Sequence, residues 1–140
     1  MYRITRKLFF SYGHRLLDYQ GKCARMHGHN ARVLVTLAAE GLDRTGMVTD
    51  FDELKRLAGR WIEENLDHRM ILSQADPAVA ALRSIGEEPF VVDFNPTAEN
   101  LSRYIFQQLS AMGLPVLEVA LDETANCTAS YMAGREGLSH

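Results

Sequence analysis

The sequence predicts an α+β fold in which an antiparallel sheet carries its helices on one face. Two β-rich runs precede an amphipathic helix, and a second helix precedes two more β-rich runs, with an irregular connector between the two halves. This ββα–αββ order implies that the sheet forms one layer and the helices the other. With 140 residues, the chain is expected to form a single domain over residues 1–140.

The first half of the chain predicts two strands and a helix. Residues 2–10 alternate weakly and end in aromatic side chains, and residues 30–39 are rich in β-branched and apolar side chains. Asp50 is expected to cap the helix, with Glu53 reaching back as in a capping box, and the helix should end near Leu66. Its apolar stripe consists of Phe51, Leu54, Leu57, Ala58, Trp61 and Ile62.

The second half predicts a helix followed by two strands. Residues 73–85 are expected to be irregular or briefly helical, and residues 89–92 form a short strand-like run. The segment Asn-Pro-Thr at 95–97 indicates a helix start with Asn or Thr as the cap, and Gly113 indicates the helix end. The inward stripe of this helix is formed by Leu101, Tyr104, Ile105 and Leu109, and the two closing strands cover residues 116–121 and 128–132.

The composition excludes several classes of protein. Hydrophobic residues make up 46% of the chain and charged residues 24%, which is typical of a soluble globular protein. The net charge of −3 argues against a dedicated nucleic-acid binder. No apolar run reaches the roughly 18 residues that cross a bilayer, and residues 1–7 lack the apolar stretch of a signal peptide. We therefore expect a cytoplasmic protein in which Cys23 and Cys127 are free thiols.

Three of the five histidines form a candidate metal site. His27 and His29 are two positions apart, so on an extended segment both side chains point to the same side. If the strand that contains His14 pairs with this segment, a third imidazole joins them, which is the ligand set of a catalytic zinc site. Gly28 would let another backbone approach closely. Two alternatives remain: a chance cluster of histidines, and a structural zinc site with Cys23 as the fourth ligand.

Cys23 lies four residues before the first histidine of this pair, on an expected loop. A thiol beside a cation has a lowered pKa and can serve as a base or a nucleophile near neutral pH. Alternatively, Cys23 is a small buried hydrophobic side chain, which is a common role for a free cysteine.

Six short segments contain most of the distinctive residues. They are FSYGHRL at 10–16, CARMHGHN at 23–30, GMVTDF at 46–51, LDH at 66–68, NPTAEN at 95–100 and DET at 122–124. In this order they resemble the segments of the 6-pyruvoyl-tetrahydropterin synthase and 6-carboxytetrahydropterin synthase superfamily, and the resemblance extends from position 10 to about position 131. Six segments in the right order are far more specific than any one of them.

The resemblance implies the tunnelling fold and an assembly of several copies. In this fold a four-stranded antiparallel sheet carries two helices, and the subunits join their sheets into a barrel. The implied state is a homo-oligomer, a trimer or hexamer, with active sites at the subunit interfaces. The resemblance also implies that His14, His27 and His29 bind Zn²⁺.

The resemblance further implies a proton-transfer group. Cys23 matches the family's proton-abstracting base, and Asp67 and His68 match the Asp-His pair coupled to it. In such a relay the carboxylate fixes the tautomer of the imidazole and stabilises its cation. The alternative for His68 is an imidazole at a helix end that interacts with the helix dipole.

Glu123 matches the family's pterin anchor. A carboxylate can accept two parallel hydrogen bonds from the 2-amino group and the N3–H group of a pterin; the alternative is a solvated acid at a strand end. Thr97 and Glu99 match residues near the pterin pocket, but both also suit the first turn of a helix.

The implied activity is that of a lyase acting on 7,8-dihydroneopterin triphosphate. The spacing Cys-x-x-x-His-Gly-His favours 6-carboxytetrahydropterin synthase of queuosine biosynthesis over 6-pyruvoyl-tetrahydropterin synthase; a non-catalytic zinc or pterin-binding module is a third reading. Arg15, Lys22 and Arg25 are candidates for the triphosphate site, although exposed basic residues are also ordinary surface.

Two residues depart from the family pattern. Tyr12 stands where the family commonly has a small residue, and Ala31 replaces a frequent aromatic residue. Neither change removes a zinc ligand or the base, but the ring of Tyr12 must pack somewhere and is expected to reshape the wall of the pocket.

Overall fold

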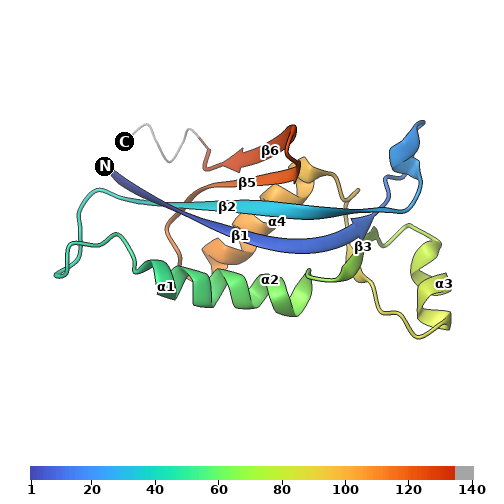
Figure 1. The fold of residues 1–140 in the computed structure, drawn as a ribbon, viewed down its shortest axis with the longest axis horizontal. Coiled ribbons are helices and arrows are strands. Elements are labelled where there is room, and N and C mark those ends of the chain that lie inside the picture. The colour runs from blue at the N-terminus through green and yellow to red at the C-terminus, as the bar shows by residue number, and fades with distance from the viewer. Residues whose placement is uncertain (135–140) are drawn as a thin grey trace.

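The computed structural model describes residues 1–134 and contains one mixed sheet. The sheet is curved, and its strand order is β4-β3-β1-β2-β5-β6 (Figure 1). The strands are β1 (Tyr2–His14), β2 (His27–Ala39), β3 (Arg69–Ser73), β4 (Phe90–Val92), β5 (Val116–Thr124) and β6 (Cys127–Met132).

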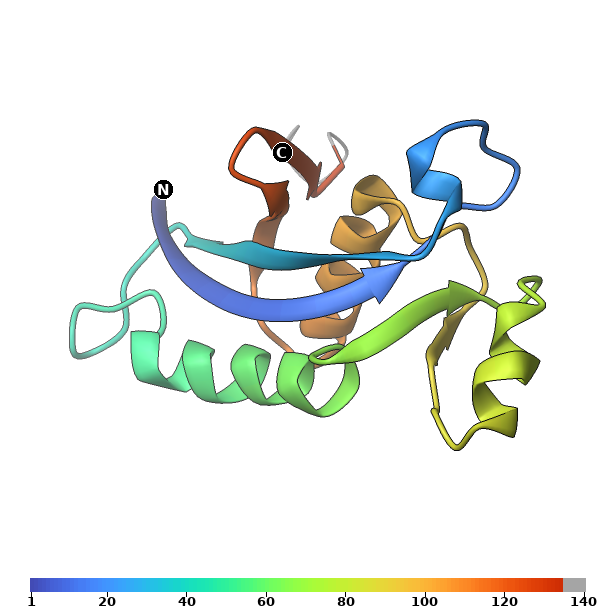
Figure 2. The same ribbon diagram turned by 45° about the vertical axis from the view of Figure 1, so that its right-hand side comes forward.

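The helices lie between the strands in sequence. They are α1 (Phe51–Leu54), a π-helical turn (Lys55–Gly59), α2 (Arg60–Asn65), α3 (Ala78–Ser84) and α4 (Ala98–Ala111), with a 3₁₀ turn at Lys22–Ala24. The first three form one continuous helical rod, whereas the 3₁₀ turn and α3 lie at one end of the sheet, beyond α2 (Figures 1 and 2). In the part of the chain described, no helix is long and apolar enough to cross a membrane.

The sheet has six strands where the sequence predicts four. The predicted antiparallel part is present, because β1 pairs with β2, β2 with β5, and β5 with β6, all antiparallel. The two extra strands, β3 and β4, are added in parallel beside the end of β1. β4 coincides with the predicted strand-like run, but β3 is missed because its five residues lie only three residues beyond a helix and show no alternation.

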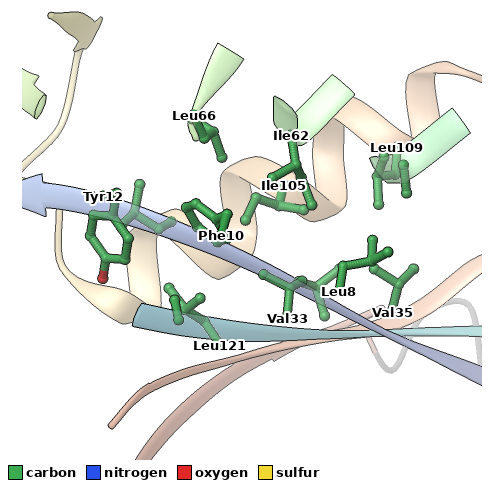
Figure 3. Close-up of a cluster of buried hydrophobic side chains, with 14 of the residues drawn as sticks. Leu8, Phe10, Tyr12, Val33, Val35, Ile62, Leu66, Ile105, Leu109 and Leu121 are labelled. Carbon is green, nitrogen blue, oxygen red and sulfur yellow. The ribbon is translucent and has the colours of Figure 1, made fainter. Parts of the chain in front are cut away.

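The core lies between one face of the sheet and the two long helical segments. Alternate residues of β1 and β2, including Leu8, Phe10, Val33 and Val35, are at most 8% exposed (Figure 3). They share a cluster with buried residues of α2 and α4, namely Ile62, Leu101, Ile105 and Leu109. The prediction that two helices cover one face of the sheet is therefore confirmed.

Both helix starts lie where the sequence places them, with two local corrections. The Asp50 side chain accepts a hydrogen bond from the Asp52 amide, but the predicted capping box does not form, because Glu53 pairs with Arg56 instead. Phe51, predicted in the apolar stripe, is 48% exposed because it lies at the first position of the helix. At the start of α4, the Thr97 side chain accepts a hydrogen bond from the Asn100 amide.

Candidate metal centre and active site

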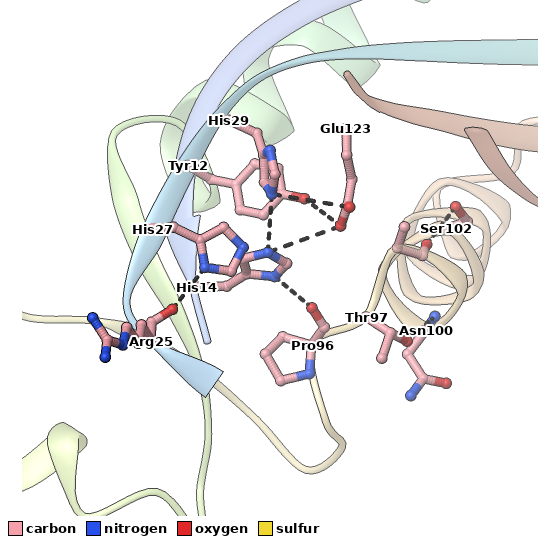
Figure 4. Close-up of polar contacts among 11 residues, drawn as sticks. Tyr12, His14, Arg25, His27, His29, Pro96, Thr97, Asn100, Ser102 and Glu123 are labelled. Atoms are coloured by element: carbon pink, nitrogen blue, oxygen red, sulfur yellow. Dashed lines mark hydrogen bonds and ion pairs between the residues drawn. The ribbon is translucent and has the colours of Figure 1, made fainter. Parts of the chain in front are cut away.

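The three predicted histidines converge at the end of the helix-covered sheet face. His14 lies directly opposite His27 across the β1–β2 ladder, and His29 lies opposite Tyr12. Because side chains alternate along a strand, all four point to the same face. One ligand nitrogen from each of the three histidines lies within 4.8 Å of the others (Figure 4). The strand pairing that the metal hypothesis requires is therefore present.

Backbone carbonyl groups orient two of the three rings. Nδ1 of His14 lies 2.7 Å from the Pro96 carbonyl oxygen, and Nδ1 of His27 lies 2.7 Å from that of Arg25. A carbonyl oxygen only accepts hydrogen bonds, so each Nδ1 carries the proton and each Nε2 is left with a lone pair. This arrangement, in which a carbonyl group fixes the tautomer of a ligand histidine, is typical of metal sites.

Burial favours the neutral form of two of the three imidazoles, those of His14 and His29. Burial lowers the pKa of His14 and outweighs the opposite effects of Pro96 and Glu123. Burial also lowers the pKa of His29, although the Glu123 carboxylate opposes this shift. Neutral imidazole is the form that binds a metal. The three converging imidazoles, two of them oriented by backbone carbonyl groups, therefore fit Zn²⁺.

Gly28 allows the close approach of the two strands beside the histidines. It lies opposite Gly13 in the ladder. A Cβ atom on Gly28 would lie 3.2 Å from the carbonyl oxygen of Tyr12, tighter than most packing contacts. The expectation that Gly28 admits a neighbouring backbone is therefore confirmed.

Glu123 lies beside the histidine cluster at the end of β5. Its Oε1 atom is 3.9 Å from Nε2 of His14, and its Oε2 atom is 3.9 Å from Nε2 of His29. The Tyr12 hydroxyl group donates a hydrogen bond of 3.3 Å to Oε1 (Figure 4). The carboxylate is 23% exposed, so it remains accessible to a ligand.

Asp67 and His68 form a contact pair that the backbone of β1 holds in place. Nδ1 of His68 lies 3.0 Å from Oδ2 of Asp67. The Ser11 amide donates to Oδ1 of Asp67, and the His68 amide donates to the Ser11 carbonyl oxygen. Partial burial alone would raise the pKa of Asp67, but the hydrogen bonds from Ser11 and His68 outweigh it and the pKa is lowered. The carboxylate thus stays ionised beside the imidazole.

His68 has a positive φ of 60°, which is uncommon for a residue other than glycine. It follows the end of α2, and its side chain is 81% exposed. His68 lines the same cleft as His27 and His29, a cleft of about 830 Å³. The structure therefore places the predicted imidazole of the Asp-His pair in a cleft that two of the three histidines also line.

Cys23 lies apart from this cleft within one chain. It is half-buried on the 3₁₀ turn between β1 and β2, where its carbonyl oxygen accepts a hydrogen bond from the Leu16 amide. It is not among the residues that line the cleft. Cys127, at the start of β6, is exposed, and both cysteines are free thiols as expected.

Thr97 and Glu99 occupy the first turn of α4. The Thr97 hydroxyl group acts as the helix cap, and Glu99 is exposed. Neither residue lines the cleft. The neighbouring Asn95 side chain bonds to both the amide and the carbonyl group of Leu17, so this segment fixes the loop that follows His14.

The three basic candidates differ in their partners. Arg15 forms a two-pronged ion pair with Asp76, a buried carboxylate, which lowers the pKa of Asp76. Lys22 and Arg25 instead line a shallow depression that also includes His27. Lys22 and Arg25 therefore lie beside His27, whereas Arg15 is held by its ion pair with Asp76.

Three contributions to the site are not predicted from the sequence. They are the carbonyl group of Pro96, the backbone of Ser11 and the hydroxyl group of Tyr12. The first two are backbone groups, so the residue type does not reveal their role. Tyr12 is conspicuous only as a large residue at a family position that is commonly small, and the sequence does not indicate its partner.

Comparison with known proteins agrees with the geometry. The model of the 6-pyruvoyl tetrahydropterin synthase family matches residues 3–134. A protein of Rickettsia bellii named 6-carboxy-5,6,7,8-tetrahydropterin synthase is 37% identical over 134 residues, covering 91% of this chain and 97% of its own length. A protein of the same name from Synechocystis is 32% identical and covers 96% of each chain.

Two solved structures share the fold. An uncharacterised protein of Wolinella succinogenes superposes with a TM-score of 0.79 at 27% identity, over 95% of this chain and 98% of that one. The 6-pyruvoyl tetrahydropterin synthase of Caenorhabditis elegans superposes with a TM-score of 0.71 at 25% identity, over 95% and 96% of the two chains. Since the family model covers nearly the whole chain, this protein belongs to the 6-pyruvoyl tetrahydropterin synthase family, whose members are lyases acting on pterins.

Proposed function

We propose that this protein is a cytoplasmic, zinc-dependent 6-carboxy-5,6,7,8-tetrahydropterin synthase. It converts 7,8-dihydroneopterin triphosphate to 6-carboxytetrahydropterin, acetaldehyde and triphosphate, as in queuosine biosynthesis. The observation that carries the proposal is the convergence of His14, His27 and His29 beside an accessible Glu123 carboxylate. It occurs in a chain 37% identical to relatives of that name.

The three imidazoles hold the metal, and Glu123 holds the substrate. A zinc ion bound there supplies a Lewis acid for the oxygen atoms of the substrate side chain. The Glu123 carboxylate accepts hydrogen bonds from the 2-amino and N3–H groups of the pterin. Its two oxygen atoms lie 3.9 Å from Nε2 of His14 and from Nε2 of His29, so the carboxylate is next to the place where the metal would bind.

Cys23 takes a proton from the substrate side chain, and the Asp67–His68 pair accepts and returns protons. The ion pair with Asp67 orients the His68 ring, and the Ser11 backbone fixes Asp67 in turn. Lys22 and Arg25, beside His27, receive the triphosphate because phosphate is bound best by nearby cationic side chains. Thr97 and Glu99 are retained as candidates for the edge of the pterin pocket.

The complete active site is formed between copies of the chain, in a trimer or hexamer. β3 pairs with β1 only at Tyr12, Gly13 and His14, so the remainder of this edge of β1 has no strand partner among residues 1–134. Phe9 on this free part is 74% exposed. An unpaired edge is a template for another chain. A neighbouring copy that pairs there would bring its own groups to the cleft, consistent with Cys23 lying outside the cleft of its own chain.

The second candidate is 6-pyruvoyl-tetrahydropterin synthase, which shares the metal site, base and anchor. The fold of the C. elegans enzyme of that name favours it. The deciding experiment is incubation of the zinc-loaded protein with 7,8-dihydroneopterin triphosphate, followed by mass spectrometry of the products. We expect 6-carboxytetrahydropterin and acetaldehyde. A pyruvoyl product without acetaldehyde would establish the second candidate, and pterin binding without turnover would leave a binding module.

The role of Cys23 is tested with a matched pair of variants. Cys23→Ala should keep one zinc per chain and lose turnover, because the metal ligands remain and the base is gone. Cys127→Ala removes an exposed thiol that does not line the cleft and should keep the full rate. Full activity of Cys23→Ala would remove Cys23 from the base role.

A further inference from the structure

One wall of the cleft comes from a small unit at one end of the sheet. This wall unit, residues 69–92, contains β3, α3 and β4 (Figure 2). Apolar side chains around the fully buried Leu72 form a small cluster of their own in it, separate from the main core. Six of its residues line the cleft with His27 and His29, namely Arg69, Met70, Leu82, Glu87, Glu88 and Pro89. The shape of the cleft therefore depends on how the wall unit is attached.

The backbone connects the wall unit to β1 over a short stretch. β3 pairs with β1 only at Tyr12, Gly13 and His14. A Cβ atom on Gly13 would collide with the sulfur atom of Met70, so the two strands are in close contact there. Among residues 1–134, no other strand pairing joins the wall unit to β1. The position of α3 and of the loop before β4 therefore depends on side-chain contacts.

The ion pair between Arg15 and Asp76 is a second attachment of the wall unit. Arg15 directly follows His14, and its Nε and one terminal nitrogen donate to the two carboxylate oxygens of Asp76, Nε at 2.7 Å. Oδ1 of Asp76 also accepts a hydrogen bond of 2.8 Å from the Ala78 amide at the start of α3. The pair thus joins the residue next to a predicted metal ligand to the first turn of α3.

The burial of this pair makes it a firm attachment. The Asp76 side chain is fully buried, and the Arg15 side chain is 27% exposed. A two-pronged bond between guanidinium and carboxylate fixes the relative orientation of the two groups. Loss of either partner leaves a buried or half-buried charge unpaired, which costs more than the loss of a surface pair. With both prongs on Asp76, the guanidinium of Arg15 is also less available to a phosphate than the side chains of Lys22 and Arg25.

We infer that Arg15 and Asp76 are positioning residues that hold the wall unit against the end of β1 and thereby set the shape of the cleft for its substrate. The inference rests on the proposed function, because it takes 7,8-dihydroneopterin triphosphate as the ligand of the cleft. It assigns Arg15 to the cleft wall and leaves the triphosphate to Lys22 and Arg25.

The first test replaces Asp76 by asparagine in the zinc-loaded protein. The amide oxygen can still accept from the Ala78 amide, but the negative charge that holds Arg15 is gone. Zinc should remain at one per chain, because the three histidines are oriented by other groups. The KM for the triphosphate substrate should rise about tenfold, with kcat changed less than about twofold, because the wall affects binding more than chemistry.

A double-mutant cycle shows whether the two residues act together. Arg15→Met should raise KM about as much as Asp76→Asn, and the double variant should match either single variant, because each one alone already releases the wall unit. Arg15→Lys keeps the charge without the fork and should give an intermediate rise. Additive effects, or a KM for Asp76→Asn equal to that of the wild type, would overturn the inference.

A ligand without phosphate separates positioning from direct contact. The affinity for 7,8-dihydroneopterin, measured by fluorescence titration, should fall in Arg15→Met and in Asp76→Asn by the same factor as for the triphosphate. If Arg15 instead binds the triphosphate, Arg15→Met will weaken only the triphosphate ligand, and the positioning role is refuted.

Two controls separate positioning from stability. Ile105→Ala lowers the stability of the main core and should keep the wild-type KM, since Ile105 is fully buried and does not line the cleft. Glu64→Gln breaks an exposed ion pair with Arg60 on α2 and should also keep it. A KM that rises equally in Ile105→Ala and Asp76→Asn would show a general loss of stability and overturn the inference.

The same measurements keep the two proposals apart. A wild-type protein that binds no zinc or turns over no substrate refutes the proposed function, and the affinity for 7,8-dihydroneopterin then still tests the ion pair. An active wild-type protein, beside an Asp76→Asn variant with the same KM and the same affinity, refutes only the positioning role.

Discussion

Two regions of one sheet face differ in chemistry although β1 and β2 build both. In the middle of the face, Leu8, Phe10 and Val33 are covered by the helices and pack into a dry core. Two to four residues further along the same alternation, Tyr12 and His14 meet His29 and His27 of β2, and these two histidines of β2 line the cleft. The alternation decides which face a side chain joins, and the extent of helix cover decides whether that face is core or site.

The largest expected effect is the loss of metal when the site is broken. His29→Ala removes one of three imidazoles, so zinc should fall from one per chain to near zero and turnover should stop. The zinc content per chain is measured by elemental analysis after dialysis. His68→Ala is the control and should retain zinc, because His68 does not belong to the cluster. Undiminished zinc in His29→Ala would contradict the ligand assignment.

A substitution in the helix-covered core should have the opposite effect: it should lower stability and leave zinc binding intact. Ile105 is fully buried under the sheet, so Ile105→Ala should lower the free energy of unfolding by about 2–5 kcal/mol. The folded Ile105→Ala variant should still bind zinc. Denaturant unfolding provides the measurement, and Ile85→Ala, at a 72% exposed residue, should change stability by less than about 0.5 kcal/mol. Equal effects of the two variants would refute the distinction between core and surface.

The ion pair between Arg15 and the buried Asp76 should contribute less to the free energy of unfolding, and its contribution should depend on pH. Arg15 holds the pKa of Asp76 below its ordinary value, so its stabilising effect is complete above the ordinary aspartate pKa. The effect is lost as the pH falls through the lowered pKa of the folded state. Asp76→Asn should therefore lower the free energy of unfolding by about 2 kcal/mol near neutral pH.

Unfolding curves over a pH series measure this contribution. The difference between wild type and Asp76→Asn should shrink on acidification, and a constant difference would show that Asp76 acts without its charge. The exposed pair of Glu53 and Arg56 is the control, because solvent screens it and Glu53→Gln should have a much smaller effect.

The smallest effect is expected at the start of α4, next to the residue whose carbonyl group orients His14. Thr97 caps α4 beside Pro96, whose carbonyl group orients His14. Thr97→Ala should lower stability by about 1 kcal/mol, and Thr97→Ser should restore it. Thermal unfolding measures the cap, and KM tests the alternative role in the pterin pocket. A raised KM that serine does not restore would show that Thr97 contributes more than a cap.

The sequence by itself determined the helices and strands of the main layer and the side to which the histidines point. These features follow from periods of 2 and 3.6 residues and from local caps, as at Asp50 and Thr97, so neighbouring residues suffice to predict them. The family resemblance adds candidate roles for Cys23 and Glu123, because segments in a fixed order carry information that single residues lack.

Only the tertiary structure decided which groups meet. The bonds from Tyr12 to Glu123, Ser11 to Asp67 and Arg15 to Asp76 join residues 111, 56 and 61 positions apart. The parallel addition of β3 and β4 beside β1 is likewise non-local. Such contacts depend on strand register and on how the helices pack, and a register shift of one residue would turn the side chains of the shifted strand, such as Tyr12 or Glu123, to the other face. No local pattern contains that information, so the partner of Tyr12 emerges only when the sheet is assembled.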